Sequence, residues 1–119
     1  MRILGIETSG AAGQAALGDD DRVVEVIQLD ARERHAQRLV PAIGELLAHH
    51  GWPPSSLELV CASIGPGSYT GLRIGLTAAK TLCYATGAKL VGVGTLEAIA
   101  HNAPPEALRV SVVSDAQRD

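Results

Sequence analysis

Short apolar segments closed by turn residues dominate the first thirty positions. They predict strands over residues 2–7, 13–18 and 22–29, and the first of these ends at Thr8-Ser9-Gly10. The acidic run Asp19-Asp20-Asp21 supplies a turn between the second strand and the third. Two short connections in succession indicate an antiparallel meander, because parallel neighbours need a longer crossover.

The apolar spacing then changes to the helical period. The residues that share one helical face are Leu39, Ile43, Leu46, Leu47 and His50. Gly51 and Pro53 end this helix at about residue 50. Proline is tolerated only in the first turn of a helix, so we expect the regular helix to begin shortly before Pro41.

The remaining pattern alternates strands and helices. It predicts strands over 57–64, 90–93 and 108–114, and helices over 70–86 and 95–101. The resulting order, β-β-β-α-β-α-β-α-β, indicates an α/β fold. We expect a mixed sheet with helices on both of its faces.

Composition narrows the function classes. The chain has 119 residues, of which 46% are hydrophobic, so it can bury a core. Its net charge of −3 and the absence of a basic stripe argue against direct binding of nucleic acid. No apolar run is long enough for a membrane span, and Cys61 and Cys83 form no CxxC motif. We expect a cytoplasmic protein with reduced thiols.

The segment from Gly65 to Gly75, Gly-Pro-Gly-Ser-Tyr-Thr-Gly-Leu-Arg-Ile-Gly, lies between a predicted buried strand and a helix. Its glycines and proline favour a tight turn, and Ser68 or Thr70 can cap the helix. The alternative is an anion site, since N–H groups at a helix start can bind anions. The candidate residues for it are Gly67, Ser68, Tyr69 and Thr70. The segment matches neither a Walker loop nor a GxGxxG fingerprint.

Small residues gather on one face of the second helix. They are Gly71, Gly75, Ala78 and Ala79. Such a face allows another backbone to approach closely. In a soluble protein it favours packing on the chain's own sheet over an interface between subunits.

No catalytic centre is evident. Glu7-Thr8-Ser9 stands where actin-like ATPases carry an acidic residue followed by glycine and a hydroxyl, but the glycine is missing. We favour a strand end hydrogen-bonded by small hydroxyls over a phosphate site. None of the four histidines forms an i, i+4 pair, so we predict no metal site.

Four motifs occur together and in order. They are Ile3-Leu4-Gly5-Ile6-Glu7-Thr8-Ser9, Arg34-His35-Ala36-Gln37-Arg38-Leu39-Val40-Pro41, the Gly65–Gly75 segment, and Val91-Gly92-Val93-Gly94-Thr95-Leu96-Glu97-Ala98. This combination resembles the TsaB (YeaZ) family across essentially the whole chain. The resemblance implies an actin-like ATPase or ribonuclease H-like lobe over residues 1–107. Residues 108–119 would begin a second lobe, without which no nucleotide cleft closes, so we expect no cofactor.

The resemblance also implies a function. Members of this family pair with TsaD, the subunit that transfers a threonylcarbamoyl group to adenosine next to the anticodon of tRNA. The His-x-x-x-His metal motif of the transferase is missing here, which implies a non-catalytic scaffold. The implied partners are a TsaD-like subunit, a TsaE-like ATPase through the complex, a second copy of the chain, and tRNA only indirectly.

We expect the partner to dock on the outward faces of the two long helices. The interface residues predicted from the first helix are Arg38, Leu39, Ala42 and Ile43, and those from the second are Arg73, Leu76 and Lys80. The alternative function is an enzyme, either an actin-like ATPase or a glycoprotease-like metallopeptidase.

Overall fold

The computed structural model describes residues 1–10, 12–29, 35–104, 106 and 111. In chain order the elements are β1 (Arg2–Glu7), β2 (Gln14–Asp19), β3 (Arg22–Gln28), α1 (His35–His49), a 3-10 turn (Pro54–Ser56), β4 (Leu59–Ser63), α2 (Tyr69–Thr86), β5 (Lys89–Val93) and α3 (Thr95–Ala100). Each strand and helix predicted within these residues is present. Apart from the start of α1, the bounds agree to within two residues.

The five strands form one mixed sheet in the order β3-β2-β1-β4-β5. β1, β2 and β3 are antiparallel neighbours, whereas β4 and β5 run parallel to β1. The lengths of the connections explain these directions. The two-residue turn between β2 and β3 can join only antiparallel strands, whereas α2 connects the parallel strands β4 and β5. Asp20, with φ of 55°, makes the turn between β2 and β3. The predicted meander is confirmed.

Large apolar side chains point to one face of the sheet, where they form the core. Leu4, Leu17 and Val60 come from three neighbouring strands and are completely buried. The apolar stripe of α1 packs against them: Leu39, Ile43, Leu46 and Leu47 are at most 2% exposed. The helical period predicted these four correctly. His50, at the end of the same stripe, instead places Nε2 2.7 Å from Oε1 of Glu25 on β3.

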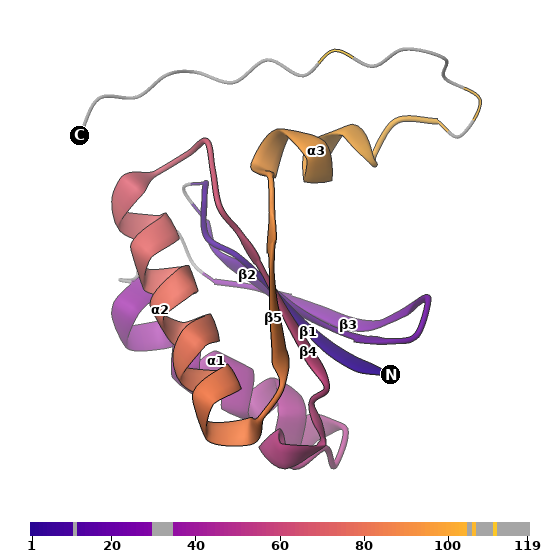
Figure 1. Cartoon of the computed structure of the whole chain (residues 1–119), viewed down its shortest axis with the longest axis vertical. Helices are drawn as coiled ribbons and strands as arrows, with labels where there is room; N and C mark the ends of the chain where they lie inside the picture. The colour runs from indigo at the N-terminus through magenta and orange to yellow at the C-terminus, as the bar shows by residue number, and fades with distance from the viewer. Residues whose placement is uncertain (11, 30–34, 105, 107–110, 112–119) are drawn as a thin grey trace.

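The expected mixed sheet with helices is confirmed. α1 and α2 pack against each other on the same side of the sheet (Figure 1). The opposite face carries Gly5, Ala16 and Cys61, because side chains alternate between the two faces along each strand. On that face these residues line a shallow hollow with Ala98 of α3.

Helix α1 begins earlier than the sequence suggested. It starts at His35 and contains Pro41 in its interior, six residues beyond the start. The proline ring removes one backbone donor, which would otherwise bond the carbonyl four residues back. Pro41 is exposed, and the helix is held by the burial of Leu39, Ile43 and Leu46. Tertiary packing therefore overrides the local preference at this position.

The strand expected over residues 108–114 and the lobe boundary at residue 107 fall outside the described residues. Among the helices that are described, none is long and apolar enough to cross a membrane. Cys61 and Cys83 are free thiols, and burial raises the pKa of both.

Candidate docking site

The glycine-rich turn fixes the start of α2 to the end of β1. Ser68 is the N-cap, and its Oγ accepts a hydrogen bond of 3.1 Å from the backbone N–H of Gly71. The N–H of Ser68 donates to the carbonyl oxygen of Ser9 at 2.8 Å. A side chain at Gly67 would lie 2.6 Å from Cβ of Ser9, so only glycine lets the two segments come this close. The predicted cap at Ser68 is confirmed.

The turn therefore has a structural role. The N–H groups of Ser68 and Gly71 already have protein partners, which leaves fewer donors for an anion. Tyr69 is 61% exposed, and the guanidinium of Arg73 lies 5.5 Å from the centre of its ring. Thr70 points toward α1 and lines the groove described below. An anion site at Gly67, Ser68, Tyr69 and Thr70 remains a prediction.

Ser68→Ala should lower the free energy of unfolding by about 1 kcal/mol, because the N–H of Gly71 loses its acceptor. Urea unfolding followed by circular dichroism measures this loss. Ser55→Ala, a serine-to-alanine change at an exposed position, is the matched control and should change stability by less than about 0.5 kcal/mol. Equal stabilities of the two variants would contradict the capping role.

Glu7 ends β1 in a cluster of hydroxyl groups. Its Oε1 accepts from the N–H of Ser9 at 2.6 Å, from Oγ of Ser9, and from Oγ of Ser63 on β4 at 3.1 Å. The cluster ties together two parallel strands and the loop that meets the α2 turn. The favoured reading, a strand end hydrogen-bonded by small hydroxyls, is confirmed.

The small-residue face of α2 packs on the chain itself. Gly71, Gly75, Ala78 and Ala79 are all buried. A Cβ on Gly71 would lie 2.1 Å from the carbonyl oxygen of Thr8, and a Cβ on Gly75 would lie 2.2 Å from Oγ1 of Thr8. Oγ1 of Thr8 is buried and has no hydrogen-bond partner among the described residues. The predicted role of this face, packing on the chain's own sheet, is confirmed.

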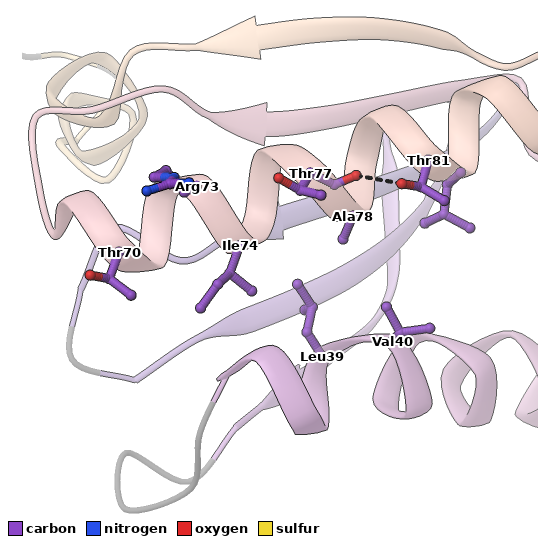
Figure 2. A pocket seen from close by; sticks show the side chains of 9 residues that line it. Leu39, Val40, Thr70, Arg73, Ile74, Thr77, Ala78 and Thr81 are labelled. Carbon is purple, nitrogen blue, oxygen red and sulfur yellow. Dashed lines mark hydrogen bonds between the residues drawn. The ribbon is translucent and has the colours of Figure 1, made fainter.

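An apolar groove runs between α1 and α2 (Figure 2). Its volume is about 460 Å³. Its lining residues are Leu39, Val40, Thr70, Arg73, Ile74, Thr77, Ala78, Thr81 and Leu82. Val40 is 58% exposed. Concave apolar surface of this kind is typical of a binding site.

The structure divides the predicted interface residues into two sets. Leu39, Ala42 and Ile43 are 1%, 6% and 2% exposed, so their assignment to an outward face was wrong. They belong to the stripe that α1 buries against the sheet. Arg38, Arg73 and Lys80 are exposed on the helices, and Leu76 is partly buried against the core. Of the seven, only Leu39 and Arg73 line the groove.

Sequence reasoning missed most of the groove. Val40, Ile74, Thr77 and Thr81 line it but were not selected. The spacing of Ile74, Thr77 and Thr81 at i, i+3 and i+7 is a detectable helical stripe. Within the described residues no group of three or more His, Cys, Asp or Glu side chains is arranged to hold a metal ion.

Comparison with known proteins assigns the fold. RuvC of Thermus thermophilus in complex with a Holliday junction superimposes with a TM-score of 0.53 at 15% identity, over 80% of this chain and 65% of that chain. At this identity the likeness concerns architecture alone. The mixed sheet and its helices form a lobe of the ribonuclease H-like, actin-like ATPase class.

More similar proteins assign the family. The family model described as "TsaD: tRNA N6-adenosine threonylcarbamoyltransferase" matches residues 26–119. A Bacillus subtilis protein named "tRNA threonylcarbamoyladenosine biosynthesis protein TsaB" is 37% identical over 119 residues, which cover 99% of this chain and 52% of that protein. YeaZ from Pseudomonas aeruginosa superimposes with a TM-score of 0.73 at 29% identity, over 80% of this chain and 44% of that chain. The chain belongs to this transferase family, in its TsaB (YeaZ) group.

The chain spans about half the length of the curated relatives that it matches. What those relatives do as whole proteins therefore enters only as a proposal about this chain.

Proposed function

We propose that this chain is the docking lobe of a non-catalytic subunit that serves threonylcarbamoyladenosine modification of tRNA. Its partner is a TsaD-like transferase subunit, which binds the groove between α1 and α2. The observation that carries the proposal is this apolar groove, lined by Val40 and Ile74 among others, in a chain of the TsaB group. An exposed apolar surface next to two long helices fits a helical partner laid along them.

The non-catalytic part of the proposal rests on Glu7. This carboxylate ends β1, at the place where the fold class can handle phosphate or metal. Oε1 of Glu7 is bonded to Ser9 and Ser63, so one of its two oxygens is already engaged in holding the strand ends together. These hydrogen bonds support a structural role for Glu7.

The wider assembly follows from the same family membership. A TsaE-like ATPase would join through the complex, tRNA would be contacted indirectly, and the complex would work in the cytoplasm. A second copy of the chain is the competing occupant of the groove, since self-association would cover the same apolar surface.

Titration calorimetry of the chain with the TsaD-like transferase of the same organism tests the docking. The proposal expects one chain to bind per transferase subunit. No heat of binding by a folded chain would contradict a docking site in this lobe.

A hydrolysis assay tests the alternative, an actin-like ATPase or a glycoprotease-like metallopeptidase. Pure chain should release no phosphate from ATP and cleave no peptide above the rate of a Glu7→Gln variant. A rate that Glu7→Gln abolishes would contradict the non-catalytic role.

A further inference from the structure

The outer side of β5 is an open edge of the sheet. β5 is the end strand in the order β3-β2-β1-β4-β5, and Figure 1 draws it in front of the other strands. The N–H of Lys89 points to β4, since it donates to the carbonyl oxygen of Glu58 at 3.0 Å. Backbone groups alternate in direction along a strand, so those of Leu90 and Gly92 point away from β4. Of the strands that the structure describes, none pairs with this outer side.

Apolar side chains border the open edge. Ile64, Leu90 and Val91 are 57%, 37% and 44% exposed. A Cβ on Gly92 would lie 2.8 Å from Cγ2 of Ile64, so the isoleucine covers the glycine on the face of β5 that also carries Leu90. Val91 points to the opposite face. Both faces of this edge therefore present apolar surface, which edge strands of monomers usually avoid.

The opposite edge of the sheet, β3, is less suited to pairing. Its register with β2 shifts between Leu17 and Gly18, and such a bulge interrupts the regular ladder of an edge strand. Glu25 of β3 is also engaged by His50 at the end of α1. β5, by contrast, pairs with β4 without a shift of register. β5 is therefore the edge that a further strand can extend.

We infer that β5 pairs with β5 of a second copy of this chain, antiparallel about a two-fold axis at Val91. The pairing joins two five-stranded sheets into one and leaves the α1–α2 groove free, so it goes beyond the proposed docking. In this register Leu90 lies opposite Gly92 of the second copy. The two residues exchange both of their outward backbone hydrogen bonds, and the axis repeats the exchange.

The side chains at this edge complement themselves. Val91 meets Val91 of the second copy at a pair without mutual backbone bonds, where side chains across two strands come closest. Leu90 faces Gly92 of the second copy, which has no side chain. The leucine can therefore fill the space beside Ile64 of that copy. Each copy places its leucine in the gap above the glycine of the other.

The charges at the two ends of β5 are also complementary. Lys89 shares a face with Val93, which lines the open-face hollow with Ala98 of α3, so Lys89 lies on the α3 side of the sheet. In the inferred register Lys89 is opposite Val93 of the second copy and next to its Gly94. Oε2 of Glu97 would lie 3.9 Å from a Cβ on Gly94. Lys89 and Glu97 are both exposed, so they can pair between the copies.

Charges placed on the two-fold axis test this pairing. Because Val91 meets itself, Val91→Lys and Val91→Glu each bring like charges together, whereas a mixture of the two variants brings opposite charges together. The β5 edge has five residues and makes a small interface, so we expect the parent chain to dimerise with a Kd of about 100 µM. Each single variant should dimerise at least about tenfold more weakly at about 50 mM NaCl, and their mixture should regain the dimer.

Static light scattering at about 200 µM chain measures this association. All proteins should carry Val40→Glu, which removes association through the groove. Val23→Lys is the matched control, because Val23 is 67% exposed on the opposite edge strand β3. This control should dimerise as the parent chain does.

Hydrogen exchange at rising chain concentration shows which edge is paired. The amides of Leu90 and Gly92 should become protected, whereas those of Lys89 and Val91 face β4 and should not change. A folded chain that stays monomeric at about 1 mM would overturn the inference. So would a dimer in which the amides of Leu90 and Gly92 exchange as in the monomer, or single variants of Val91 that dimerise as strongly as the parent chain.

Discussion

Gly71→Ala should destabilise the lobe by about 3 kcal/mol, at the upper end of the usual cost of adding one methyl group to a packed core. The new Cβ would lie 2.1 Å from the carbonyl oxygen of Thr8, which belongs to the backbone and cannot rotate away. Helix α2 would have to move off the end of β1, and the packing of Ala78 and Ala79 in the core would weaken with it. Urea unfolding measures the change in free energy.

Gly44→Ala is the matched control, because it places the same methyl group on an exposed helix position with nothing within 4 Å. It should stabilise the protein by about 0.5–1 kcal/mol through helix propensity. Gly75→Ala adds an intermediate case, since its Cβ meets the side-chain oxygen of Thr8 rather than backbone. Thr8→Ala should rescue Gly75→Ala in part and leave Gly71→Ala unrescued. A loss below about 1 kcal/mol for Gly71→Ala would contradict the packing argument.

Val40→Glu should abolish binding of the TsaD-like transferase while the lobe stays folded. Val40 is 58% exposed at the edge of the groove, so a glutamate there remains hydrated in the free chain and would be desolvated beneath a partner. We expect at least a hundredfold loss of affinity, equivalent to about 2.7 kcal/mol. Titration calorimetry measures the affinity, and circular dichroism checks the fold.

Leu39→Glu, one residue away, should behave differently. Leu39 is 1% exposed, and an unpaired carboxylate at that position should unfold the lobe or cost at least about 3 kcal/mol of stability. The pair thus separates a surface effect from a folding effect. Normal transferase binding by Val40→Glu would show that the groove is not part of the interface.

Much of the fold could be predicted because local patterns agree with the tertiary structure. The meander followed from short turns such as Asp19-Asp20-Asp21, and the buried stripe of α1 followed from the spacing of Leu39, Ile43 and Leu46. Two features depended on packing that no local pattern records. Pro41 lies inside α1 because burial of the apolar stripe stabilises the helix more than the proline destabilises it. Both long helices pack on the face of the sheet that carries Leu4, Leu17 and Val60.

The two helices that form the candidate site could be predicted from the sequence, but the groove between them could not. The sequence indicated α1 and α2 but could not orient them, so Ala42 and Ile43 were placed outward although they are buried. A groove between two helices depends on their relative positions, and Val40 and Ile74 become neighbours of one surface only in the folded chain. The turn at Ser68 was easier to interpret, because capping is a local interaction.

Size-exclusion chromatography with light scattering can show whether this lobe docks to the transferase. The tagged chain would be co-expressed with the TsaD-like transferase of the same organism, with Val40→Glu carried in parallel. The parent chain should form a complex of one chain per transferase subunit, and Val40→Glu should give separate peaks. Separate peaks for a folded parent chain, or an undiminished complex with Val40→Glu, would contradict docking through the groove.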